Sequence, residues 1–220
     1  MTGVQTCALP ILKCMEKAAV IKSPRDAQNL GISTVYQEIT LCPNLTVAEN
    51  MYIGRGKTQM MDWKKMNADA DAILDKLGIP AGATQQLSDC SIAIQQMVAI
   101  ARAVDMDCKV LILDEPTSSL DESEVEKLFG LMRDLRERGM GIIFVTHFLD
   151  QVYEVCDKIT VLRDGQLVGE YVIEELPRVK LVAKMLGKEL NDMENIREKT
   201  EGYKGADERV IEAEGLQSDA

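Results

Sequence analysis

Hydrophobic and polar positions along the chain alternate between strand-like and helix-like stretches. Residues 109–113 (KVLIL) form a continuous apolar run, which predicts a central strand covered on both faces. Gly141–Val145 is predicted to be a second buried strand on the same grounds. Residues 159–171 are expected to form a β-hairpin around the turn dipeptide Asp164-Gly165. Shorter strands are expected at residues 17–21 and 32–36.

Apolar residues at helical spacing predict helices between these strands. Most of residues 45–77 is expected to be helical, with Gly78 as the stop. Asp121 and Glu124 form a capping-box pattern at the start of a helix that Gly139 ends. Within residues 45–77, the residues near helical spacing are Trp63, Met66, Ala70, Ile73 and Leu77. Further helices are expected over residues 24–30, from Ser91 onward and over residues 177–187. Such alternation is typical of an α/β protein with a largely parallel sheet.

Composition narrows the function classes. The 220 residues carry 25 Lys and Arg against 36 Asp and Glu, a net charge of −11, which argues against a nucleic-acid partner or a polybasic membrane anchor. One His and six scattered Cys exclude a multi-histidine metal site and indicate a reduced, intracellular chain. No apolar run approaches the roughly 18 residues of a membrane span, so we expect a soluble cytoplasmic domain.

The two ends of the chain read differently from its middle. Residues 1–11 (MTGVQTCALPI) resemble the translation of a sequencing-library adapter, and we expect them to be non-native. Residues 12–187 are expected to form one domain. Residues 188–206 have the composition of a charged linker, and residues 207–220 are expected to be the truncated start of a second domain.

Two carboxylates follow the predicted central strand. Asp114 and Glu115 stand where open α/β sheets bind ligands, at the carboxyl end of a strand. A carboxylate there can hold Mg²⁺, and its neighbour can orient and deprotonate an attacking water. The alternative is that the pair merely begins a loop.

The residues that follow make the first interpretation much stronger. Pro116 to Asp121 (PTSSLD) come directly after the carboxylates, and His147 follows the next strand. In this order the sequence resembles the ATP-binding cassette (ABC) family. The resemblance makes Asp114-Glu115 the Walker B motif, places Asp121 in the loop that crosses the dimer interface, and makes His147 the residue that contacts the γ-phosphate. A lone histidine could otherwise be a core or surface residue.

Gln37 lies in a stretch (VYQE) that resembles the family's Q-loop. The resemblance implies that Gln37 reaches Mg²⁺ and the attacking water, and that residues 39–55 lead toward a membrane partner. The alternative is a polar residue that ends a strand. Residues 45–50 (LTVAEN) resemble the family's entry into a helical subdomain, which we expect over residues 45–103.

The family's LSGGQ-type signature corresponds here to a degenerate stretch, CSIAI. Ser91 and the helix N-terminus behind it could cap the γ-phosphate held by another subunit. Ile92 and Ala93 replace the usual glycines, so a close backbone approach is less assured. The alternative is that Ser91 is only an N-cap.

Loosened motifs of this kind resemble those of sugar importers with two ATPase domains in one chain. The resemblance implies ATP and Mg²⁺ as cofactors, ATP hydrolysis that drives uptake of a galactofuranose-like monosaccharide, and a place at the cytoplasmic side of the inner membrane. It also implies membrane permease subunits, an indirect solute-binding protein, and a second cassette or second copy as partners.

One family motif does not occur. The 220 residues contain no Gly-x-x-x-x-Gly-Lys-Ser/Thr, the phosphate-binding loop. We therefore expect a P-loop NTPase-like fold that is incomplete at its N-terminus, and a chain that binds ATP poorly by itself. The alternatives are a non-catalytic fragment and a cassette ATPase of the DNA-repair type.

Overall fold

The computed structural model describes residues 12–14, 17–19, 21–37, 40–55 and 62–187. It contains two compact units, Met1–Phe148 and Leu149–Ala220, and each is described by itself. The predictions for residues 1–11, 188–206 and 207–220 lie outside the described residues.

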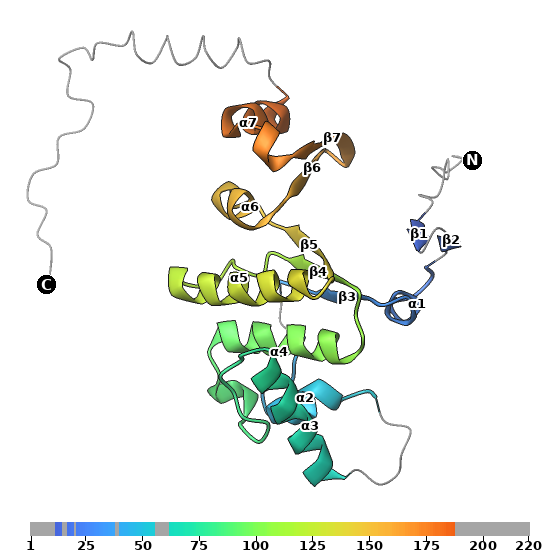
Figure 1. Ribbon diagram of the computed structural model, residues 1–220, viewed down its shortest axis with the longest axis vertical. Coiled ribbons are helices and arrows are strands. Elements are labelled where there is room, and N and C mark those ends of the chain that lie inside the picture. Colours follow the sequence, from blue (N-terminus) through green and yellow to red (C-terminus); the bar gives the residue numbers. More distant parts are fainter. Residues whose placement is uncertain (1–11, 15–16, 20, 38–39, 56–61, 188–220) are drawn as a thin grey trace, which may run out of the picture. The chain divides into compact units, whose positions relative to one another are not determined.

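A parallel sheet forms the centre of the first unit. Its order is β3 (Ile32–Val35), β4 (Val110–Asp114) and β5 (Gly141–Val145), so the apolar run of β4 is the central strand, as predicted (Figure 1). Val35 pairs with Leu113, and Leu113 pairs with Phe144, so the carboxyl ends of all three strands meet at one edge. The predicted α/β fold is confirmed.

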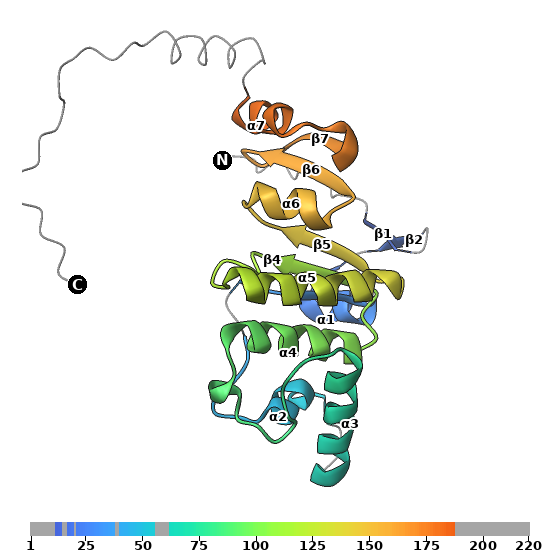
Figure 2. The ribbon, with the colours of Figure 1, turned by 60° about the vertical axis from the view of Figure 1, so that its left-hand side comes forward.

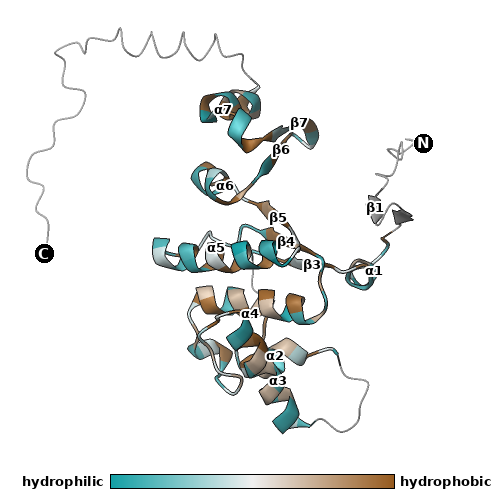
Figure 3. Cartoon of the chain, in the orientation of Figure 1, coloured by the Kyte–Doolittle hydropathy of each residue, from teal (hydrophilic) through white to brown (hydrophobic). Residues whose placement is uncertain are grey.

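Two helices cover one face of this sheet. They are α4 (Ile92–Asp105) and α5 (Glu122–Glu137), which lie side by side in both views (Figures 1 and 2). Leu111, Leu113 and Phe129 are fully buried there, and the ring of Phe129 meets the ring of Phe144 edge-on at 6.1 Å. Figure 3 shows β4 and β5 as hydrophobic, and α5 as mostly hydrophilic on the side in view.

The prediction that β4 is covered on both faces and β5 is buried is wrong for the described residues. Ile143 and Val145 are 51% and 46% exposed. Side chains alternate along a strand, so the contact of Phe144 with α5 turns Ile143 and Val145 to the opposite face. Val110 and Ile112 of β4, on that same face, are only partly buried.

Residues 45–77 were expected to be mostly helical, and their described part contains two helices. α2 (Val47–Tyr52) ends because Ile53 is extended and Gly54 has a positive φ of 83°, and α3 (Trp63–Lys76) starts anew behind its N-cap Asp62. The buried stripe of α3 also differs from the prediction, since Trp63 is 53% exposed. Its buried residues are Met66, Ala70 and Leu74, followed by Leu77.

Four smaller elements lie in the described part of the first unit. β1 (Leu12–Cys14) and β2 (Lys17–Ala19) pair antiparallel, and α1 (Pro24–Asn29) starts behind the N-cap Ser23, with Pro24 at its first position, as expected. A short 3₁₀ turn, η1 (Leu87–Asp89), precedes α4.

The second unit is built around the predicted hairpin. Its elements are α6 (Leu149–Val155), β6 (Lys158–Arg163), β7 (Gln166–Val172), η2 (Ile173–Glu175) and α7 (Arg178–Leu186). Asp164 and Gly165 turn the hairpin with φ values of 52° and 74°, as a type I′ turn requires. Val161, Leu176 and Leu181 form the core of this unit. No helix among the described residues has both the length and the apolar character needed to cross a membrane.

Candidate functional site

The carboxyl edge of the sheet gathers most of the predicted site residues. The aligned ends of the strands place Gln37 after β3, Asp114 and Glu115 at the end of β4, and His147 after β5. Ligands of open α/β sheets bind at such an edge. The edge is therefore the candidate functional site.

Glu115 has an unusual backbone. Its φ is +46°, in the left-handed region that side chains other than glycine seldom adopt, and its N–H donates to the carbonyl of Val145 at 2.9 Å. This conformation turns the chain sharply out of β4, ahead of the buried residues Pro116 and Thr117. Left-handed residues of this kind are concentrated at functional sites.

The side chains of Glu115 and His147 meet directly. His147 Nδ1 lies 3.1 Å from Glu115 Oε1, and the two side chains are 61% and 30% exposed respectively. An ionised carboxylate can only accept hydrogen bonds, so Nδ1 is the donor and Nε2 is left for another group. The structure thus brings together two of the three residues that were predicted to be catalytic.

Gln37 is exposed on a bend just after β3, and the segment beyond it is anchored elsewhere. Asn50 of α2 is fully buried, accepts from the Cys42 N–H at 2.7 Å, and donates to the carbonyls of Cys42 and Thr46 at 2.9 and 3.0 Å. Sequence reasoning missed this role of Asn50. A polar residue within the apolar stretch LTVAEN was the available signal.

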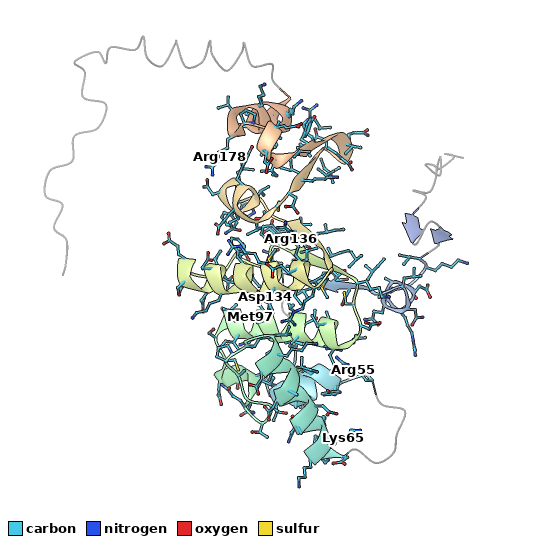
Figure 4. The ribbon with its side chains drawn as sticks, viewed as in Figure 1. Arg55, Lys65, Met97, Asp134, Arg136 and Arg178 are labelled. Carbon is cyan, nitrogen blue, oxygen red and sulfur yellow. The ribbon has the colours of Figure 1, made fainter. Side chains whose placement is uncertain are left out.

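A second anchor joins the C-terminal ends of α2 and α4. Arg55, labelled in Figure 4, forms an ion pair with Asp105, donates to the Arg102 carbonyl at 2.9 Å and lies over the Tyr52 ring. Arg102 in turn donates to the carbonyl of Ile53 at 3.2 Å. Burial lowers the pKa of Arg102, with the neighbouring Arg55 charge as a smaller cause. Together, the two anchors fix residues 42–55 on the helical part of the unit.

The degenerate signature lies at the start of α4. The Ser91 hydroxyl accepts from the Ile94 N–H at 3.4 Å, so it caps its own helix. Ile92 is 50% exposed beside it, whereas Ala93 is 3% exposed and faces the core. Of the two residues that replace glycines, only Ile92 therefore presents its side chain at the surface.

Asp121 caps α5 as the capping-box pattern predicted. Its carboxylate accepts from the Glu124 N–H at 2.8 Å and from the Ser123 hydroxyl at 2.9 Å, and the Glu124 side chain accepts from the Asp121 N–H. The hydrogen bond from the Glu124 backbone, followed by that from Ser123, lowers the pKa of Asp121. This carboxylate stays ionised at neutral pH.

Asp114 and Gln37, the residues expected to hold Mg²⁺, carry oxygen donors at the ends of neighbouring strands. Among the described residues, no cluster of three His, Cys, Asp or Glu side chains could hold a metal ion. The available donors fit Mg²⁺ of the kind bound by one or two protein oxygens, with phosphates and water completing its shell. They do not fit a metal held entirely by protein side chains.

Comparison with known proteins identifies relatives of this chain. Residues 14–118 match the family model for ABC transporters. The chain is 52% identical over 193 residues to the galactofuranose transporter ATP-binding protein YtfR of Escherichia coli (strain K12), an alignment that covers 87% of this chain and 39% of YtfR. It is 46% identical over 225 residues to the fructose import ATP-binding protein FruK of Bifidobacterium longum, covering 98% of this chain and 43% of FruK. The chain thus spans about two fifths of the length of these curated relatives.

Solved structures agree on the fold. The ADP conformation of MJ1267, an ATP-binding cassette of an ABC transporter, aligns with a TM-score of 0.67 and 23% identity over 78% of this chain and 72% of that one. The dimeric post-hydrolysis state of the ATP-binding cassette MJ0796, bound to ADP and Pi, aligns with a TM-score of 0.57 and 26% identity over 70% and 68%. The described α/β unit therefore has the fold of an ATP-binding cassette.

Proposed function

Because residues 14–118 match the family model for ABC transporters, we propose that the chain belongs to this family and is part of an ATP-hydrolysing subunit of a sugar importer. The observation that carries the proposal is the contact of Glu115 with His147 at the carboxyl edge of a cassette-fold sheet. The similarity to YtfR and FruK supports a sugar as the transported substrate. Because those relatives are described for galactofuranose and fructose, the proposed cargo is a monosaccharide of this class.

In this proposal Glu115 is the general base. Its Oε1 accepts a hydrogen bond from His147 Nδ1, and the carboxylate takes a proton from the attacking water. His147 is then free to meet the γ-phosphate through Nε2. Mg²⁺, held through Asp114 and Gln37, would neutralise charge on the phosphates.

The N-terminus of α4 and the loop before α5 supply the remaining proposed contacts. Backbone N–H groups at Ile92 and Ala93, with Ser91, would face the γ-phosphate of ATP held by a second cassette, in the same chain or in another copy. Asp121 would lie at the interface between the two cassettes. The exposed positions of Ser91, Ile92 and Asp121 are compatible with these roles.

Residues 39–55, of which the structure describes 40–55, are the proposed contact with a membrane permease, at the cytoplasmic side of the membrane. Two independent anchors support a rigid contact surface here, one at Asn50 and one at Arg55. A solute-binding protein would act through the permease and not touch this chain. The net charge of −11 disfavours the alternative of a DNA-repair ATPase.

The domain assignment is part of the proposal. Residues 12–187 would belong to a first cassette, residues 188–206 to a linker and residues 207–220 to a second cassette, while residues 1–11 would be foreign to the gene. The 220-residue chain, which contains no phosphate-binding loop motif, is then expected to release almost no phosphate from ATP.

The test has two steps. Sequencing of source DNA upstream of the Leu12 codon is expected to show a strand followed by Gly-x-x-x-x-Gly-Lys-Ser/Thr. In the complete gene product, Glu115→Gln should then lower the turnover of ATP by about 10²–10⁴, the contribution of a general base. Glu137→Gln, the same change at an exposed position at the end of α5, is the matched control and should leave turnover unchanged.

Either step can contradict the proposal. If residues 1–11 prove to be encoded in the source gene, the enzyme assignment for this chain fails. If Glu115→Gln and Glu137→Gln hydrolyse ATP equally fast in the complete product, Glu115 is not the base.

A further inference from the structure

The imidazole of His147 has a second neighbour besides Glu115. The ring of Phe148 lies against it, with centroids 4.1 Å apart and the ring planes tilted by 36°. Phe148 is 38% exposed, so its ring is not held by burial in a core. The two rings therefore form a stacked pair at the surface of the site.

The backbone around His147 is closed into a small turn. The N–H of Phe148 donates to the Thr146 hydroxyl at 3.0 Å, so a hydrogen bond joins the residues on either side of His147. Such hydroxyl-to-backbone turns restrict the chain locally. This turn sets the position from which the Phe148 ring reaches His147.

One hydrogen bond alone would leave the imidazole poorly fixed. The His147 side chain is 61% exposed, and its partner carboxylate is 30% exposed, so water competes for both. A hydrogen bond to Nδ1 also leaves the ring free to pivot about that contact. Stacking on Phe148 restrains the plane of the ring, which the hydrogen bond does not.

We propose that Phe148, held by Thr146, is a positioning residue that keeps the His147 imidazole with Nδ1 on Glu115 and Nε2 free for a ligand. The role of Nε2 rests on the proposed function. The orientation of the ring does not, because it follows from the contacts of this chain without nucleotide.

The experiment uses the fact that His147 is the single histidine of the chain. The ring ¹⁵N spectrum of the 220-residue protein then reports on this residue without ambiguity. The spectrum is recorded at rising pH until the two ring ¹⁵N shifts no longer change, where they report the tautomer of the neutral ring. We expect a protonated Nδ1, an unprotonated Nε2, and ring protons shifted by the adjacent Phe148 ring.

Phe148→Leu should give a mixture of the two His147 tautomers and remove the shift of its ring protons. Phe148→Tyr should restore the single tautomer and the ring-proton shift. Trp63→Leu is the matched control, since it removes an exposed aromatic ring from α3, and its spectrum should equal that of the wild type. Thr146→Val should act like Phe148→Leu, while Thr146→Ser should behave as the wild type.

An unchanged tautomer in Phe148→Leu, with Nδ1 still protonated and Nε2 still unprotonated, would overturn the proposal. If Phe148→Leu does not fold, the Thr146→Val and Thr146→Ser pair decides in the same way. These spectra need no ATP. A failure here leaves the general-base role of Glu115 intact, and a failure of Glu115→Gln in the turnover assay leaves the ring orientation intact.

Discussion

The anchor at Asn50 allows a sharp test of how the segment after Gln37 is held. Asn50 is fully buried and is bonded in both directions to the backbone of Cys42, with an accepted bond of 2.7 Å and a donated bond of 2.9 Å. These two bonds tie residues 40–46 to the first turn of α2. Asn50→Ala removes them together.

The stability lost in Asn50→Ala depends on which hydrogen bonds the former partners of Asn50 still make. After the substitution the Thr46 carbonyl still accepts from the backbone N–H of residue 50 at 3.0 Å, and the Cys42 carbonyl still accepts from the Leu45 N–H at 3.2 Å. The Cys42 N–H has no other partner among the described residues. Two short bonds at a net 0.5–1.5 kcal/mol each give about 1–3 kcal/mol of lost stability.

Urea unfolding followed by circular dichroism measures this loss. With a slope of about 2 kcal/mol per molar urea, Asn50→Ala should lower the midpoint by roughly 0.5–1.5 M. Asn44→Ala is the matched control, because it makes the same change at an exposed position and should stay within about 0.5 kcal/mol of the wild type. Equal midpoints for the two variants would refute the anchoring role.

Asn50→Asp separates the two halves of the interaction. An aspartate can still accept from the Cys42 N–H, but it has no hydrogens for the carbonyls of Cys42 and Thr46 and would bury a carboxylate against them. We expect it to destabilise the protein at least as much as Asn50→Ala does. A stability equal to the wild type would show that the donated bonds contribute nothing.

Two further predictions concern the core and pH. Phe129→Ala removes a fully buried ring that meets Phe144 edge-on, so the free energy of unfolding in urea should fall by about 3–5 kcal/mol, and a loss below about 1 kcal/mol would contradict this packing. Burial raises the pKa of the thiols of Cys90, Cys108 and Cys156. At about pH 8.5 the thiols of the unfolded chain begin to ionise, whereas those of the folded protein remain protonated. The stability they contribute is therefore present below that pH and lost above it. Urea midpoints at neutral and alkaline pH should show the loss, Cys108→Ala should reduce it, and an unchanged pH dependence in that variant would contradict the assignment to Cys108.

Local chemistry explains what the sequence predicted well. The capping box of Asp121 and Glu124 and the hairpin turn at Asp164-Gly165 depend on contacts only a few residues apart, and both were confirmed. The central position of β4 was also predicted, because continuous apolar runs are typical of the inner strands of parallel sheets, and the strand order confirms it.

The hydrophobic pattern of the sequence does not show which elements pack against each face of a strand, or where a helix ends. Apolar runs do not reveal which face a helix covers, so β5 was predicted to be buried although Ile143 and Val145 are about half exposed. A helical period likewise continues across a break. Residues 45–77 are mostly helical as expected, but the pattern did not show that α2 ends at Ile53 and Gly54, where Gly54 has a positive φ.

The site shows the same division between local pattern and three-dimensional contact. The motifs with Gln37, Glu115 and His147 each follow a strand, and the strand register aligns the carboxyl ends of these three strands. The motif order could not predict that His147 meets Glu115 through Nδ1, or that the Phe148 ring lies against the imidazole, because these contacts depend on rotamers. Asn50 was missed because its partners lie in a loop.

The backbone conformation of Glu115 lowers the stability of the fold at the candidate site. A glycine would adopt a φ of +46° without strain, whereas a residue with a side chain there costs on the order of 1–3 kcal/mol. The strand-to-turn geometry alone would therefore favour glycine at this position. A carboxylate stands there instead, and the same sharp turn that strains it carries its Oε1 to His147. The strain is accepted because the turn, and not the strand, presents the carboxylate to the ring.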